Sequence, residues 1–197
     1  MIRRPVVDGQ FYPASPERLE REVKEYLDPE GSPQAAVAAV VPHAGYIYSG
    51  PVAGAVYARL AVPETVVILA PNHTGMGPPI SVWATGAWLT PLGEVQIDEQ
   101  LASALLAGFP QAESDQEAHR REHSIEVQLP FIQYFTQEAK FVPITMMLQD
   151  PETAREVGTV IREAVGGKDV VIIASSDFSH YVPPEVAKEK DMMAINQ

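Results

Sequence analysis

The sequence contains no cysteine among its 197 residues. This absence excludes disulfide bonds, thiol nucleophiles, thiolate zinc sites and iron–sulfur clusters. Histidine, aspartate, glutamate and water are the ligands that remain for a metal ion. Any metal site in this chain is therefore expected to consist of imidazoles and carboxylates.

Basic residues and long apolar runs are also scarce. The chain has 14 Lys plus Arg against 26 Asp plus Glu, a formal charge of −12, and its longest basic runs are the pairs Arg3-Arg4 and Arg120-Arg121. Nucleic-acid binding relies on clustered basic side chains, so neither DNA nor RNA is an expected partner. There is no uncharged apolar stretch of about 18 residues and no apolar secretion segment at the amino terminus. We therefore expect a cytoplasmic protein without membrane contact.

Apolar runs rich in β-branched residues predict four buried strands, at 36–41, 66–70, 140–145 and 170–174. Each run is apolar at consecutive positions rather than at alternate ones. Strands of this kind are covered on both faces, as in a sheet between two layers of helices. The sequence therefore predicts a sheet buried at the centre of the fold.

Helices are predicted between these strands, because apolar residues recur there at helical spacing. Ser15, Asp98 and Asp150 are the expected amino-terminal caps. The predicted helices span 16–27, 51–60, 99–107 and 151–165; a further helix runs from Pro183-Pro184 to Gln197, and 80–96 is assigned to an antiparallel strand pair. The alternation of strands and helices predicts a layered α/β domain.

Histidine and aspartate side chains follow three of the predicted strands. His43 follows the first strand and His73 the second, while Asp177 and His180 follow the last. Ligands bind beyond the carboxyl ends of the strands in open α/β sheets, so these residues are expected on one rim. A single histidine after a strand is more often a hydrogen-bonded turn residue, but four such groups on one rim favour a site. Two imidazoles beside a carboxylate suit iron, copper or zinc.

Asp177 and His180 are three residues apart. If a helical turn forms there, the carboxylate can hold the imidazole in one tautomer, as a general base requires. The structural alternative is that Ser176 or Asp177 caps a helix. The sequence has no nucleophile elbow, no P-loop and no dinucleotide-binding glycine pattern, which disfavours serine hydrolase and nucleotide chemistry.

His123 allows two interpretations of equal weight. It is either a site residue or part of the cap of a helix that carries Ile125, Leu129 and Ile132, with Glu126 completing a capping box or facing solvent. His119 precedes His123 by four residues, a spacing that can chelate zinc on a helix. The basic pair at 120–121 indicates a solvated turn, so His119 is set aside.

Five phrases of the chain, in this order, resemble the Memo-like family, whose microbial members are also called AmmeMemoRadiSam system protein B. The resemblance extends from about residue 3 to the end. The phrases are Asp8-Gly9-Gln10-Phe11-Tyr12-Pro13, Pro42-His43-Ala44-Gly45-Tyr46, Pro71-Asn72-His73, Glu122-His123-Ser124-Ile125-Glu126-Val127-Gln128-Leu129-Pro130 and Ser175-Ser176-Asp177-Phe178-Ser179-His180.

The resemblance implies the fold of the class III extradiol dioxygenases (LigB-like), a mixed, largely parallel sheet between helical layers. It implies one Memo-like α/β domain over 1–197 that lacks a carboxyl-terminal part present in relatives. It also implies that His43 and His73 bind Fe(II) or Cu, with Zn as a further option. The third ligand of the family is commonly a cysteine in that missing part. The metal is therefore expected to be completed by water or Asp177, to be held weakly, or to be absent.

The resemblance further assigns the residues around the metal. His180 corresponds to the acid/base histidine of the dioxygenases, and Asp177 and His123 are placed with it as catalytic residues. Phe11 and Tyr46 are placed in the substrate pocket.

Three functional hypotheses follow. The leading one is a Memo-like non-haem metal protein with redox activity, in one version dioxygenase chemistry on a small aromatic molecule. The second is a non-catalytic module that binds a peptide or phosphopeptide in the same pocket, as an animal member is described to do, although the charge of −12 disfavours anions. The third is a zinc hydrolase. The sequence leaves open whether the chain forms a homo-oligomer.

Overall fold

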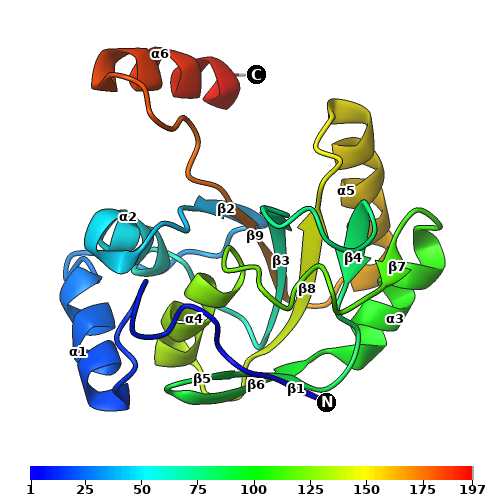
Figure 1. Ribbon diagram of the computed structural model, residues 1–197, viewed down its shortest axis with the longest axis horizontal. Helices are drawn as coiled ribbons and strands as arrows, with labels where there is room; N and C mark the ends of the chain where they lie inside the picture. The colour runs from blue at the N-terminus through cyan, green and yellow to red at the C-terminus, as the bar shows by residue number, and fades with distance from the viewer. Residues whose placement is uncertain (197) are drawn as a thin grey trace.

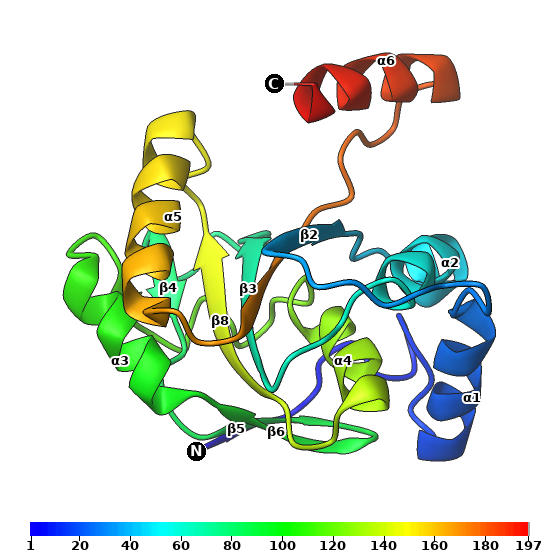
Figure 2. The same cartoon turned by 180° about the vertical axis from the view of Figure 1, so that it is seen from behind.

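The computed structural model describes residues 1–196, and a nine-stranded sheet lies at its centre (Figures 1 and 2). The strands are β1 (Ile2–Arg3), β2 (Ala38–Val41), β3 (Thr65–Pro71), β4 (Ile80–Val82), β5 (Ala87–Thr90), β6 (Gly93–Ile97), β7 (Glu113–Ser114), β8 (Lys140–Met146) and β9 (Val170–Ser175). Their order is β1-β5-β6-β8-β3-β9-β2; β4 also pairs with β8, and β7 pairs with β4.

The sheet is mixed and mostly parallel, as predicted. The neighbours β8, β3, β9 and β2 all run in the same direction. Antiparallel pairs are confined to β4 with β8 and β5 with β6. All four predicted strands are present, although the first begins at Ala38, two residues later than expected. Its predicted burial was wrong: β2 is the edge strand next to β9, and of its residues only Val41 is buried.

Helices cover both sides of the sheet. They are α1 (Pro16–Tyr26), α2 (Tyr46–Tyr57), α3 (Glu99–Gly108), the 3-10 turn η1 (Glu126–Gln128), α4 (Leu129–Phe135), α5 (Pro151–Val165) and α6 (Pro184–Ile195). The helices α3 and α5 pack together on one side, and α1, α2 and α4 form a group on the other (Figure 1). The predicted α/β layers are therefore confirmed.

The three predicted amino-terminal caps are present. The Ser15 side chain accepts a hydrogen bond from the backbone N–H of Arg18, and Asp98 accepts one from Leu101. Asp150 accepts two, from the N–H groups of Glu152 and Thr153. Each bond satisfies a donor that the first helical turn leaves free, which fixes where the helix begins.

The predicted start of α2 was wrong. The helix begins at Tyr46 rather than Pro51 and ends at Tyr57, so Pro51 lies inside it. A proline normally excludes its preceding residue from the helical region, because its ring contacts that residue's Cβ. The preceding residue here is Gly50, which has no Cβ, so the chain continues through the proline.

Two less regular segments were predicted in part. The segment 80–96 contains the antiparallel pair β5 and β6, but β4 at its beginning pairs with β8 instead. The last helix is present as α6, while Gln197 lies outside the described residues. Figures 1 and 2 show α6 standing away from the rest of the chain, and none of its residues is buried. Within the described residues, no helix combines the length and apolar content that a membrane crossing requires.

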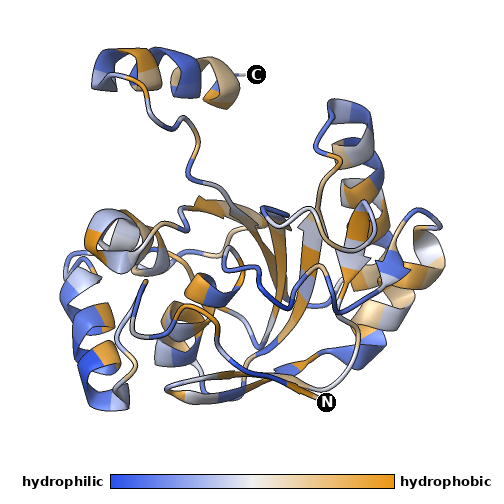
Figure 3. Cartoon of the chain, viewed as in Figure 1, coloured by the Kyte–Doolittle hydropathy of each residue, from blue (hydrophilic) through white to orange (hydrophobic). Residues whose placement is uncertain are grey.

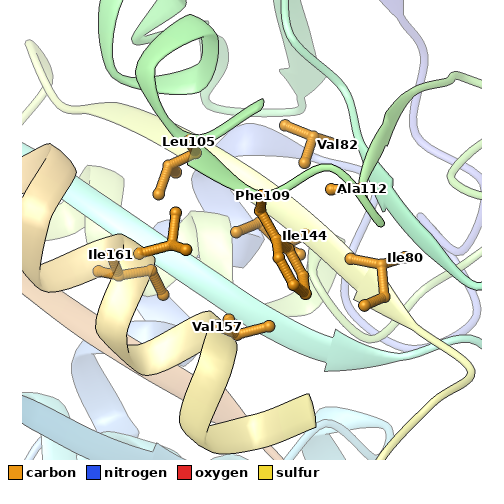
Figure 4. Close-up of a pocket in the computed structure, with 9 residues that line it drawn as sticks. Ile80, Val82, Leu105, Phe109, Ala112, Ile144, Val157 and Ile161 are labelled. Carbon is orange, nitrogen blue, oxygen red and sulfur yellow. The ribbon is translucent and has the colours of Figure 1, made fainter. Parts of the chain in front are cut away.

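The hydrophobic core follows the central strands, which are mainly orange in Figure 3. Val66, Val67 and Ile68 of β3 are fully buried. Between the sheet and the helices α3 and α5 lies a cavity of about 10 Å³, which is lined by apolar side chains such as Leu105 and Ile161 (Figure 4). A space of this size holds about one water molecule, so it is a packing gap rather than a ligand site.

Candidate metal centre

Three histidines meet at one rim of the sheet. His43 follows β2, His73 follows β3, and His123 lies in the loop before η1. One ring nitrogen from each lies within 4.8 Å of those of the other two. The ring centroid of His43 lies 5.3 Å from that of His73 and 5.7 Å from that of His123. The rings of His73 and His123 are stacked, with their centroids 4.8 Å apart. The cluster offers three imidazole ligands to one metal ion.

The order of the strands brings the first two histidines together. β9 pairs on one side with β2 and on the other with β3, all in parallel. His43 and His73 therefore leave the sheet on either side of the end of β9. The loop after β3 is shaped by Asn72, whose side-chain oxygen accepts hydrogen bonds from the backbone N–H groups of Thr74 and Gly75.

His123 reaches the cluster on a loop that the amino terminus holds in place. Arg3 Nη2 donates a hydrogen bond to the carbonyl oxygen of Glu122 (2.6 Å), and Arg3 Nε donates to that of His119 (2.9 Å). The Arg3 guanidinium also forms an ion pair with Glu126 at 2.7 Å, with both side chains almost fully buried. Glu126 therefore neither completes a capping box nor faces solvent, because its carboxylate is the buried partner of Arg3.

Glu122 links two of the histidines. Its side chain is 1% exposed, and its Oε1 accepts hydrogen bonds from His73 Nδ1 at 2.9 Å and from the backbone N–H of His123 at 2.9 Å. Its Oε2 accepts the backbone N–H of His73 at 2.6 Å. Because a carboxylate only accepts, His73 carries a proton on Nδ1, and in the neutral ring Nε2 is the unprotonated nitrogen. Carboxylates orient metal-binding imidazoles in the same way.

Asp177 joins the cluster to His180. Its Oδ1 accepts hydrogen bonds from the backbone N–H groups of His43 and Ala44. Its Oδ2 lies 3.8 Å from His43 Nε2 and 3.5 Å from His180 Nε2. The expected helical turn at Asp177 is absent: Phe178 and Tyr181 both have positive φ, and His180 Nδ1 donates to the Phe178 carbonyl at 2.7 Å. The 3.5 Å approach to Asp177 is achieved by this irregular turn.

Burial controls the charge of the cluster. Removal from water lowers the pKa of His43 to about 4 and also lowers that of His123. Burial raises the pKa of Glu122, but hydrogen bonds from His73 and from the Ser124 backbone outweigh it, and the net shift is downward. At neutral pH, His43 and His123 are therefore neutral bases beside an ionised carboxylate. Metal binding requires this state of the ligands.

The two expected pocket residues lie in different surroundings. Phe11 contacts His123 edge to face, with ring centroids 4.8 Å apart. Tyr46 is 2% exposed and packs on Tyr12 and Phe131, and its hydroxyl donates to the Val127 carbonyl. Phe11 thus lies against the cluster, whereas Tyr46 lies in the core.

His119 is not in a solvated turn, which corrects the interpretation of the sequence. It is fully buried against Trp83 and Trp88, and the described residues offer its ring nitrogens no hydrogen-bond partner. The neighbouring basic side chains suggested exposure, but the apolar partners come from another part of the sequence, Trp83 directly after β4 and Trp88 in β5. Sequence reasoning also assigned no role to Glu122 or Ser175, although both lie within the phrases that carry the family resemblance.

The donor set fits a transition-metal ion. Three imidazoles supply borderline-soft nitrogen ligands, which suit zinc, copper and iron. Glu122 and Asp177 lie close enough to balance the charge of a divalent cation. His123 offers a third imidazole beside His43 and His73.

Comparison with known proteins identifies the family to which the chain belongs. The family model for Memo-like protein matches residues 3–197. A MEMO1 family protein of Methanothermobacter thermautotrophicus is 44% identical over 211 residues, covering 100% of this chain and 76% of that protein. The MEMO1 family protein of Methanosarcina barkeri is 49% identical over 194 residues, covering 96% and 72%, and that of Ignicoccus hospitalis is 46% identical over 214 residues, covering 100% and 75%. This chain belongs to the Memo-like family.

Proposed function

We propose that this protein binds one redox-active metal ion, iron or copper, through His43, His73 and His123, and uses it in oxidation–reduction of a small molecule. The observation that supports the proposal is the set of three imidazole nitrogens within 4.8 Å of one another. Their neighbours also favour metal binding, because burial keeps His43 and His123 neutral and Glu122 orients His73.

Iron and copper are preferred among the metals that imidazoles accept because the redox hypothesis requires an ion with two accessible oxidation states. When bound, such an ion would supply electron transfer and activation of dioxygen. The residues of the chain would bind the ion, balance its charge through Glu122 and Asp177, and leave positions free for a ligand.

A cleft that adjoins the cluster through Asp177, without being lined by the three histidines themselves, provides space for that ligand. It has a volume of about 410 Å³, and its lining includes Asp177, His180, Tyr48 and Phe178. The aromatic rings offer apolar contact, while the Asp177–His180 pair, 3.5 Å apart, can hold or transfer a proton at His180 Nε2. Among the residues that the structure describes, the lining contains no Lys or Arg, which disfavours phosphopeptides. We therefore propose a small, partly aromatic molecule as the ligand.

Metal analysis tests the proposal directly. The metal-free protein is loaded anaerobically with Fe(II), or with Cu(II), and bound metal is measured by elemental analysis after desalting. We expect one ion per chain, and loss of that ion in the His43→Ala/His73→Ala double variant. His180→Ala is the matched control, because it also removes an imidazole but leaves the three-histidine cluster intact.

Oxygen consumption with ascorbate as reductant then tests the redox part. The iron- or copper-loaded protein is expected to consume dioxygen faster than the loaded double variant at equal total metal. Equal metal content in wild type and double variant would refute the site, and equal oxygen consumption would refute the redox role.

A zinc hydrolase is the second candidate, because three histidines around an open position also form hydrolytic zinc sites. This alternative would be favoured if the zinc-loaded protein cleaves an activated ester and the His43→Ala variant does not, while the iron-loaded protein consumes no dioxygen.

A further inference from the structure

Ser175, the last residue of β9, lies directly behind His43. It is 3% exposed, and its Oγ makes three polar contacts within the protein. The partners are His43 Nδ1 at 3.0 Å, Gln128 Nε2 at 2.9 Å and the carbonyl oxygen of Ser124 at 2.7 Å. A hydroxyl has one donor and two acceptor positions, so these contacts use all of its capacity.

The orientation of the Gln128 amide is fixed by its other neighbours. One end of the amide faces the carbonyl oxygen of Pro42 at 3.0 Å, and the other faces the Tyr57 hydroxyl at 3.1 Å. A carbonyl can only accept, so the end toward Pro42 must be the NH₂ group. The same NH₂ group then donates its second hydrogen to Ser175 Oγ.

The hydroxyl proton of Ser175 can be donated to only one of its partners. Its Oγ already accepts from Gln128, and the Ser124 carbonyl at 2.7 Å can only accept. The hydroxyl proton therefore points to Ser124. The lone pair that remains on Oγ faces His43 Nδ1, which must supply the proton for that contact.

We propose that Ser175, held by Gln128 and Ser124, is a positioning residue that fixes His43 in the tautomer with its proton on Nδ1. The unprotonated Nε2, which lies 3.8 Å from Asp177 Oδ2, is then the ring nitrogen that can bind a metal ion. This inference rests on the proposed function only in naming His43 a ligand, because the tautomer follows from hydrogen bonds of the protein alone. Glu122 fixes His73 with a charged acceptor, whereas Ser175 fixes His43 with a neutral one.

The metal-free protein provides the first test. The chain has five histidines, so ¹⁵N-labelled imidazoles give a small set of ring signals, and loss of one set in His43→Ala assigns His43. Ring ¹⁵N shifts and two-bond couplings distinguish the two neutral tautomers. We expect the Nδ1–H form in wild type, a shift toward the Nε2–H form in Ser175→Ala, and restoration of Nδ1–H in Ser175→Thr, which keeps the hydroxyl. An Nε2–H signal in wild type, or an unchanged signal in Ser175→Ala, would overturn the inference.

Metal affinity provides the second test, by competition with a chelator for Zn(II) as a redox-silent probe. Loss of the partner that orients a metal-binding histidine costs about tenfold to a hundredfold in affinity, and we expect a loss in that range for Ser175→Ala. Ser175→Thr is expected to recover most of the affinity. Ser81→Ala is the matched control: Ser81 is fully buried on β4 and hydrogen-bonds to Asp115, away from the cluster.

Equal losses of affinity in Ser175→Ala and Ser81→Ala would overturn the inference, because they would reflect general destabilisation. A different outcome separates the two proposals. If wild type binds no metal but His43 shows the Nδ1–H tautomer and responds to Ser175→Ala, the metal function fails and the role of Ser175 stands.

Discussion

The Arg3–Glu126 ion pair shows how one residue near the chain start supports a distant loop. Besides Arg3, the Glu126 carboxylate accepts hydrogen bonds from the Tyr12 hydroxyl at 2.6 Å and from the backbone N–H groups of Val6 and Val7. Burial and the adjacent carboxylate raise the pKa of Tyr12, so its hydroxyl stays a donor. The Arg3 guanidinium, the Tyr12 hydroxyl and the two backbone N–H groups all use the Glu126 carboxylate as their hydrogen-bond acceptor.

We expect Glu126→Gln to lower the free energy of unfolding by about 3–5 kcal/mol, because breaking a buried ion pair leaves the Arg3 charge without compensation. Urea denaturation followed by circular dichroism measures the change. Glu117→Gln is the control, since the Glu117–Arg120 pair is largely exposed and its loss costs less than about 1 kcal/mol. Similar losses in the two variants would contradict the prediction.

Single residues were predictable from sequence only where a rule connects them to the fold. His43 and His73 were placed together because residues after parallel strands meet at one rim. Glu126 was misjudged because its partner Arg3 is 123 positions away, and nothing local indicates that pairing. His119 was misjudged for the same reason, since its neighbours in sequence are charged while its neighbours in space are tryptophans.

At the level of elements, α1 and α2 approach each other through two glycines one helical turn apart. A Cβ on Gly54 would lie 2.2 Å from the backbone oxygen of Tyr26, and a Cβ on Gly50 would lie 2.4 Å from the Tyr26 ring. These distances are far below van der Waals contact. The helix α2, which follows His43, therefore packs closely on α1 only because Gly50 and Gly54 have no side chains.

Gly54→Ala is expected to destabilise the protein by about 1–3 kcal/mol, because the added methyl forces α1 and α2 apart. Gly158→Ala is the matched control in α5, where a Cβ would meet nothing within 4 Å. That variant is expected to stabilise the protein by about 0.5–1 kcal/mol through helix propensity. Thermal unfolding of both variants measures the difference, and a Gly54→Ala protein as stable as Gly158→Ala would contradict the close packing.

Most elements were predictable because their signals are local. Caps such as Asp98 and Asp150, and continuous apolar runs such as 170–174, define where helices and strands lie. The start of α2 was missed because a proline such as Pro51 normally lies in the first turn of a helix. Here Gly50 can adopt helical geometry before the proline, so the helix begins earlier. The pairing of β4 with β8 was missed because it joins segments about sixty positions apart.

At the scale of the whole molecule, buried imidazoles set the response to acid. Burial is the main cause that lowers the pKa of His119 to about 3 and that of His43 to about 4. In the unfolded chain these groups titrate near 6.5, so between about pH 6.5 and 3 the unfolded state binds more protons than the folded state. The metal-free protein is therefore most stable above pH 6.5 and loses stability as the pH falls below it.

We expect His119→Phe to reduce this pH dependence by up to about 1.4 kcal/mol per pH unit, because one proton less is taken up on unfolding. The phenyl ring also removes the two buried ring nitrogens that lack partners among the described residues. Urea denaturation at pH 7, 6 and 5 measures the slope for both proteins. Identical slopes would show that His119 is protonated equally in the folded and unfolded states.

The position of β1 has a practical consequence for work with this protein. The carbonyl oxygen of Met1 accepts a hydrogen bond from the N–H of Ala87, and a Cβ on Gly86 would lie 2.0 Å from that same oxygen. Two residues later, Arg3 holds the loop that delivers His123. A truncated variant that starts after Arg3 would lose these hydrogen bonds, so preparations meant for metal titration should keep the amino-terminal strand.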